Sequence, residues 1–179
     1  MKNNLKKGIK YFVLIAILAI VGLLSYVSFA LPDVGDPENL TIEITPERIE
    51  RGKYLAHSVN ACMDCHSKRD WTKAAGPIIE GTLGQGGEEF SQEFGFPGKF
   101  YSKNITPYAL KDWTDGEIFR AITAGVNKDG KALFPVMPHP NYGKSDREDI
   151  YSIIAYIRTL QPIENVVPES VPDFPMNFI

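Results

Sequence analysis

The first thirty-one residues divide into a basic segment and a long apolar run. Residues 1–10 contain four lysines, and residues 11–31 are almost entirely apolar. About 20 apolar residues in a helix span the ~30 Å hydrocarbon core of a bilayer. The basic flank places residues 1–10 in the cytoplasm and everything after residue 31 in the periplasm or exterior. The pattern predicts a transmembrane anchor, with the alternative of a signal peptide cleaved near Ala30 to give a soluble periplasmic protein.

The next apolar pattern of helical period begins after a linker. Residues 32–44 contain two prolines and a glycine and read as an extended linker. Thr45 is a suitable N-cap, and Pro46 suits the first helical position. Apolar residues then fall on one face of the predicted helix. Gly52 lies within that face and predicts a place where another helix backbone comes close.

Two further helices are predicted downstream, each from a capping box. Thr114 and Glu117 open the first of them, and Gly125 is suited to its C-terminal end. Ser145 and Glu148 are predicted to open the second. Four isoleucines follow there at the i, i+3, i+4, i+7 spacing of an amphipathic helix, so it must pack against a partner. Its expected partner is the helix that contains Gly52.

The remaining segments predict loops and an extended tail. Residues 80–100 are rich in glycine and phenylalanine and are interpreted as a loop with aromatic anchors that cover core or cofactor. Residues 163–179 contain three prolines and are expected to run extended over the surface. No stretch shows the alternation of a β-strand. The fold class predicted for residues 45–162 is therefore all-α.

The chemistry of the chain is concentrated in the sequence Cys62-Met63-Asp64-Cys65-His66. This is the C-x-x-C-H signature of covalent haem attachment, in which both thiols form thioethers with one porphyrin and the histidine lies under the iron. Three other interpretations are a zinc site, a thioredoxin-like redox pair and coincidence. A zinc site needs four ligands, and a second Cys or His pair at metal-ligand spacing is missing, since only His57 and His139 remain. A redox pair needs a preceding strand in a βαβ unit. The sequence contains no other cysteine.

The second axial ligand of such an iron must come from elsewhere in the chain. Met137 is the leading candidate, because it lies between two prolines in a loop about seventy residues after the motif, where the chain can cross to the far side of the haem. A thioether ligand would raise the reduction potential compared with two histidines. The alternatives are Met176, which also fits a core position, and His139, which would give a bis-histidine iron. His57 is assigned no role. The carbonyl of Pro77 is the hypothesised acceptor of the second ring N–H of His66.

The net charge of the chain after residue 30 limits the kinds of partner that it is expected to bind. After residue 30 the chain carries 15 basic and 22 acidic side chains, a formal charge of −7. A domain this acidic is a poor nucleic-acid binder and favours a partner with a basic docking face.

Several short motifs together resemble a known family. Residues 43–162, about two-thirds of the chain, resemble class I monohaem cytochromes c, and especially the cytochrome c domains of dehydrogenase electron-transfer subunits. The resemblance is carried by the haem motif and by Glu50-Arg51-Gly52-Lys53-Tyr54-Leu55, Gly76-Pro77, Asn104-Ile105-Thr106-Pro107, Trp113-Thr114-Asp115-Gly116-Glu117 and Leu133-Phe134-Pro135-Val136-Met137-Pro138.

The resemblance implies a cytochrome c fold whose terminal helices cross near Gly52. It implies one covalent haem c per chain, ligated by His66 and Met137, with the Pro77 carbonyl orienting His66. Two departures matter. Family subunits commonly carry two or three C-x-x-C-H motifs where this chain has one, and residues 80–100 form a longer segment than in minimal cytochromes c, interpreted as a docking surface.

The function expected from these features is single-electron transfer by a membrane-anchored carrier that is not itself an enzyme. The expected partners are a membrane dehydrogenase or a terminal oxidase, and the membrane itself through the N-terminal helix. One alternative is the haem-bearing subunit of a dehydrogenase or oxidase complex. The other is a gas or redox sensor in which Met137 dissociates, against which the rigid Pro-Val-Met-Pro sequence argues.

Overall fold

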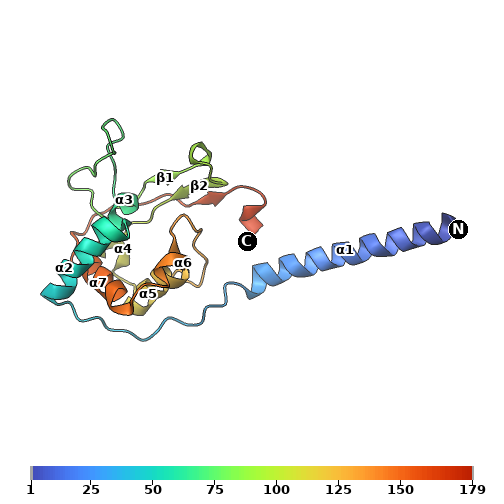
Figure 1. Ribbon diagram of the computed structural model, residues 1–179, viewed down its shortest axis with the longest axis horizontal. Helices are drawn as coiled ribbons and strands as arrows, with labels where there is room; N and C mark the ends of the chain where they lie inside the picture. The colour runs from blue at the N-terminus through green and yellow to red at the C-terminus, as the bar shows by residue number, and fades with distance from the viewer. Residues whose placement is uncertain (1, 179) are drawn as a thin grey trace.

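Within residues 2–178, which the computed structural model describes, a long N-terminal helix precedes a helical domain with a small sheet at one side (Figure 1). The α-helices are α1 (Lys2–Ala30), α2 (Pro46–Tyr54), α3 (Cys62–His66), α4 (Pro107–Leu110), α5 (Asp115–Ala124), α6 (His139–Tyr142) and α7 (Arg147–Arg158). The strands are β1 (Glu89–Phe90), β2 (Gly98–Tyr101) and β3 (Val171–Pro172). Single turns of π- or 3-10 helix are η1 (Leu55–Val59), η2 (Gln92–Phe94) and η3 (Met176–Phe178).

Helix α1 contains the apolar run and extends beyond it. It begins at Lys2, well before residue 11, and ends at Ala30, so the basic segment is also helical. Residues Asn4–Ala30 are long and apolar enough to cross a membrane, and none of the most apolar window is buried against the domain. A helix of this kind near the N-terminus serves either as an anchor or as a signal sequence.

The local start signals of α2 and α5 act as predicted. The Thr45 hydroxyl accepts a hydrogen bond from the backbone N–H of Arg48, with Pro46 at the first position of α2. Thr114 and Glu117 form a complete capping box at α5, and Gly125 ends that helix at φ +68°. Each cap satisfies a backbone N–H that has no partner inside the helix.

The predicted cap of α7 is wrong by one residue. The N-cap is Asp146, whose carboxylate accepts from the N–H of Glu148 at 2.8 Å. Ser145 instead belongs to the preceding turn, where its N–H donates to the Tyr142 carbonyl. Both residue types cap helices well, so the pattern of residue types alone does not choose between two neighbours.

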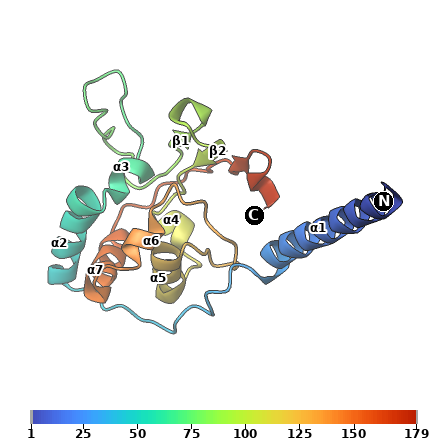
Figure 2. The ribbon, with the colours of Figure 1, turned by 45° about the vertical axis from the view of Figure 1, so that its right-hand side comes forward.

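The core forms where α2 crosses α7. Figures 1 and 2 both show these helices side by side. A Cβ atom on Gly52 would lie 1.8 Å from the Ser152 carbonyl oxygen, so only glycine permits this approach. The four isoleucines of α7 that share the predicted face are all buried: Ile150, Ile153, Ile154 and Ile157. The predicted crossing at Gly52 is therefore confirmed.

The prediction of a domain without strands is wrong in one region. Strands β1, β2 and β3 form an antiparallel sheet in that order, with Phe90 opposite Phe100 and Lys99 opposite Val171. The glycine- and phenylalanine-rich segment supplies the first two strands, and the proline-rich tail supplies the third. Strands of two to four residues are too short to give a readable alternation of apolar and polar side chains.

The extended segment between α1 and α2 is held against the domain. We call residues 35–42 the strap, and Figures 1 and 2 show this part of the chain running beneath α5 and α7. The Glu38 carboxylate pairs with the Arg147 guanidinium through hydrogen bonds of 2.7 and 3.1 Å. Ile42 is buried, and its N–H donates to the Asp115 carboxylate at 2.9 Å. The strap is therefore fixed by contacts with both helices.

We predict that Gly116→Ala releases the strap. A Cβ atom on Gly116 would lie 1.8 Å from the Glu38 carbonyl oxygen, which cannot move without displacing the strap backbone. The free energy of unfolding should fall by about 1–3 kcal/mol. The Ile42 amide should exchange its hydrogen faster, as measured by hydrogen–deuterium exchange. Asp112→Ala, at an exposed position just before α5, is the control; equal Ile42 protection in both variants would contradict this account.

Candidate haem-attachment site

The C-x-x-C-H motif forms the single helical turn α3. The π-helical turn η1 precedes it, and Ala61, at φ +51°, redirects the chain into the turn. Positions three apart lie on the same side of a helix, so Cys62 and Cys65 lie together. Met63, between them, is fully buried and fixes the turn to the core. Cys62 is partly buried and Cys65 is exposed, and both thiols are free.

The pKa values of the two thiols disfavour a redox-active cysteine pair. Burial raises the pKa of Cys62 to about 12. Although Cys65 is exposed as a residue, partial desolvation of its sulfur, followed by the Asp64 charge, raises the pKa of its thiol. A redox-active cysteine pair requires a thiolate, which a raised pKa disfavours. The turn before the motif is π-helical, whereas a thioredoxin-like pair would follow a strand. Within residues 2–178, no group of three or more His, Cys, Asp or Glu side chains is arranged to hold a metal ion.

His66 is oriented by the carbonyl of Lys103. Its Nδ1–H donates to that oxygen at 2.7 Å, because a carbonyl can only accept. The predicted partner, Pro77, is wrong: its carbonyl accepts from the backbone N–H of Asp70 at 2.9 Å. Burial lowers the pKa of His66, which favours the neutral imidazole that binds metals. Since Nδ1 is used, Nε2 is the nitrogen left for an iron ligand bond.

A polar network around Asn104 fixes the position of that carbonyl. Asn104 is buried, and its side-chain oxygen accepts from the N–H and the hydroxyl of Thr106. Its amide nitrogen donates to the carbonyls of Ile163 and Asn165 in the tail. The turn that follows Lys103 is thereby tied to the C-terminal segment. Sequence reasoning identified the turn but missed its link to His66, because no spacing rule connects positions 37 residues apart.

Met137 lies in the loop between α5 and α6, half-buried against the domain core. Met137 packs against the hydrophobic core, and so do Cys62, Leu83 and Ile105. Phe134, three residues earlier, stacks on Phe100 of β2 with ring centroids 4.0 Å apart. The structure therefore packs both the predicted second ligand and Cys62 of the haem motif against the hydrophobic core of the domain.

The other two histidines are engaged by hydrogen bonds. The His57 Nε2 atom lies 2.8 Å from the Tyr156 hydroxyl on α7, so His57 helps to join η1 to α7. The His139 Nδ1 atom lies 3.2 Å from the Met137 carbonyl oxygen, and its ring packs on Gly125. Both side chains have structural contacts that hold them in place. The expectation that His57 has no role is thus too narrow, since it contributes to packing.

The residues present fit a covalently attached haem. Two free thiols and a histidine lie on one helical turn, the histidine tautomer is fixed with Nε2 available, and Cys62 packs against the same hydrophobic core as Met137. A site of this kind defines the class of proteins with c-type haem.

Comparison with known proteins supports a cytochrome c domain. No protein-family model matches the chain. It is 32% identical over 134 residues to the fructose dehydrogenase cytochrome subunit of Gluconobacter japonicus, covering 72% of this chain and 25% of that protein. It is 30% identical over 129 residues to the cytochrome c subunit of the quinone-dependent alcohol dehydrogenase of Gluconacetobacter polyoxogenes, covering 70% of this chain and 24% of the relative.

A third relative is the gluconate 2-dehydrogenase cytochrome c subunit of Pantoea cypripedii. The identity is 30% over 145 residues, which cover 79% of this chain and 27% of the relative. The chain thus spans about a quarter of the length of these curated relatives. These three relatives are cytochrome or cytochrome c subunits of dehydrogenases.

Proposed function

We propose that this chain is a c-type cytochrome that carries single electrons on the outer or periplasmic face of a membrane. The observation that carries the proposal is the C-x-x-C-H turn α3 with the His66 ring held by the Lys103 carbonyl. Cys62 and Cys65 would hold one haem c through thioether bonds, and His66 and Met137 would be the axial ligands. When bound, the iron supplies the reversible Fe(III)/Fe(II) couple.

The chain's own residues then determine how this couple behaves. The Lys103 carbonyl fixes the orientation of the imidazole and increases its basicity as a ligand. A methionine ligand raises the reduction potential, and the apolar cluster beside it limits access of water. If His66 and Met137 both held the iron, no coordination position would remain for a substrate, so the site would transfer electrons without chemical conversion of a bound molecule.

Two further parts of the proposal concern location and assembly. Helix α1 would anchor the domain in the cytoplasmic membrane as a single span, with cleavage near Ala30 as the alternative. The names of the relatives favour a second candidate function, in which the chain is the haem-bearing subunit of a dehydrogenase complex. The proposed redox partner is therefore a membrane dehydrogenase or a terminal oxidase.

The attachment chemistry is tested by removing the thiols. We predict that the unmodified protein retains haem in a denaturing gel stained for haem peroxidase activity. The Cys62→Ala/Cys65→Ala double variant should lose that stain completely, because no thioether bond remains. Ser58→Ala, in the preceding turn, is the control and should stain normally. Haem staining of the double variant equal to that of the unmodified protein would contradict the proposal.

A further inference from the structure

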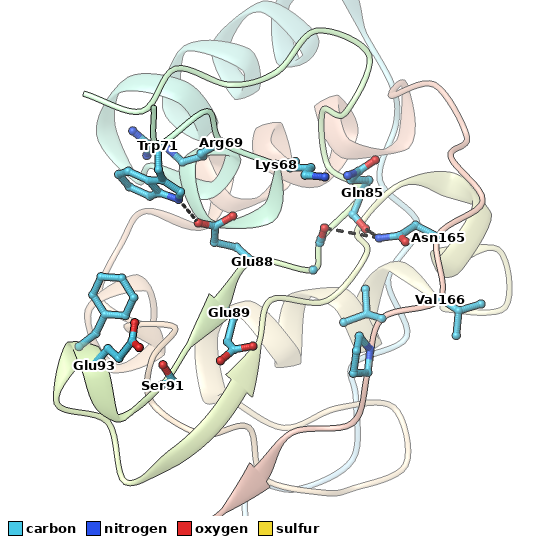
Figure 3. A pocket seen from close by; sticks show the side chains of 15 residues that line it. Lys68, Arg69, Trp71, Gln85, Glu88, Glu89, Ser91, Glu93, Asn165 and Val166 are labelled. Atoms are coloured by element: carbon cyan, nitrogen blue, oxygen red, sulfur yellow. Dashed lines mark hydrogen bonds between the residues drawn. The ribbon is translucent and has the colours of Figure 1, made fainter. Parts of the chain in front are cut away.

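A surface groove lies directly beside the haem-attachment turn. It has a volume of about 550 Å³ and is formed by three segments that are distant in sequence (Figure 3). Residues 68–71 follow the motif, residues 85–94 contain β1 and η2, and residues 165–168 belong to the tail. We call it the proximal groove, defined by Lys68, Arg69, Trp71, Gln85, Gly86, Gly87, Glu88, Glu89, Ser91, Glu93, Phe94, Asn165, Val166, Val167 and Pro168.

The floor of the proximal groove is bonded to the proposed haem ligand. The Gly86 N–H donates to the His66 carbonyl at 2.8 Å. A Cβ atom on Gly86 would lie 2.5 Å from the Asn104 backbone nitrogen, so the floor is closely packed backbone. A molecule bound in the groove would thus be separated from His66 by a single layer of chain.

Trp71 is exposed and at the same time fixed in position. Its side chain is 63% exposed, unusual for so large an aromatic residue. Its Nε1–H donates to the Glu88 carboxylate at 2.5 Å, as Figure 3 shows. The Arg69 guanidinium lies 4.9 Å from the ring centroid, and the ring packs on Gly76. An exposed aromatic side chain that is already ordered loses little entropy on binding, which is the property of an interface hot spot.

The rim of the proximal groove combines apolar surface with negative charge. Phe94 is 67% exposed and Val166 is 87% exposed. Three carboxylates line the groove, from Glu88, Glu89 and Glu93, against Lys68 and Arg69. The Arg69 guanidinium is 3.4 Å from the Asp64 carboxylate and also donates to two backbone carbonyls, so its charge is offset within the chain. The rim is therefore acidic with exposed apolar side chains.

We propose that the proximal groove is the docking site for a redox partner protein that presents a basic segment with an apolar or aromatic side chain against Trp71. The redox character of the partner rests on the function proposed above, whereas the docking itself rests on the groove. Complementary charge would steer the encounter, and Trp71 would contribute most of the binding energy. The acidic rim disfavours an anionic lipid surface as the occupant.

The test measures binding separately from electron transfer. A small, lysine-rich c-type cytochrome is the probe, titrated calorimetrically into the full chain held in lipid nanodiscs. Binding is expected at about 0.01 M ionic strength and should weaken at about 0.15 M, as the Debye length falls from about 30 to about 8 Å. Trp71→Ala should weaken the affinity for the probe about tenfold or more. Glu93→Lys should weaken it several-fold and reduce its salt dependence.

Two matched controls and a second variant make the result decisive. Tyr54 is also an exposed aromatic under an arginine, at 5.9 Å from Arg51, but lies on α2; Tyr54→Ala should bind the probe normally. Glu50→Lys is the matched charge reversal, also on α2. Phe94→Ser, which changes an exposed side chain of η2, repeats the test if Trp71→Ala does not fold.

The proposal would be overturned by any of three results. The first is that the probe does not bind the unmodified chain at low ionic strength. The second is that the groove variants and the control variants lose the same amount of affinity for the probe. The third is that a groove variant changes the oligomeric state, which would identify a second copy of this chain as the occupant. Failure of the haem assignment is separately visible, because the pyridine haemochrome spectrum of each preparation reports haem while calorimetry reports docking.

Discussion

Met137→Ala should lower the reduction potential and remove the weak near-infrared sulfur-to-iron band of the oxidised protein. Axial ligands set haem potentials over a range of roughly 0.8 V, and methionine lies toward its upper part, so the expected decrease is a substantial fraction of that range. The haem should remain attached, because the two cysteines are unchanged. Redox titration and absorption spectroscopy measure both effects.

Two control variants make this result specific for Met137. Met176 begins the C-terminal turn η3, and His139 follows the Met137 loop with its ring on Gly125. Met176→Ala and His139→Ala should both keep the near-infrared band. Loss of the band in Met176→Ala, with the band retained in Met137→Ala, would show that the second ligand has been assigned to the wrong residue.

Gly52→Ala should destabilise the domain more than any exposed substitution on the same helix. The added Cβ atom would lie 1.8 Å from the Ser152 carbonyl oxygen and 2.9 Å from the Tyr156 Cβ atom. Neither neighbour is the end of a flexible side chain, so α2 and α7 must separate. The expected loss in the free energy of unfolding is about 3 kcal/mol or more.

Chemical denaturation measures this loss. Glu50→Ala, on the exposed side of α2, is the matched control and should change the free energy of unfolding by less than about 0.5 kcal/mol. Equal stability of the two variants would mean that the close crossing of α2 and α7 is absent in solution.

Features specified by neighbouring residues could be predicted from the sequence. The Thr45 cap, the Thr114 capping box and the buried face of α7 each depend on residue types within one or two helical turns. The C-x-x-C-H motif has the same property, because five consecutive residues supply the thiols and the histidine. Gly52 was informative because a glycine in a helix interior costs about 1 kcal/mol against alanine and therefore indicates a steric requirement.

Features specified by distant segments could not be predicted in this way. The acceptor of the His66 ring N–H depends on which loop carbonyl comes within hydrogen-bond distance, and the structure places Lys103 there instead of Pro77. The sheet was missed because its strands have only two to four residues. The composition of residues 32–44 indicates an extended segment. It does not indicate that Glu38 pairs with Arg147, because these two residues are 109 positions apart in the sequence. Tertiary packing decides all three features.

The central claim is that one haem c is bonded to Cys62 and Cys65. The most direct measurement is the pyridine haemochrome spectrum of the purified full chain, quantified against protein concentration. The account predicts the α-band position of a haem with both vinyl groups converted to thioethers, at one haem per chain. A free-haem band position, or no haem in protein matured in a host competent for c-type attachment, would contradict it.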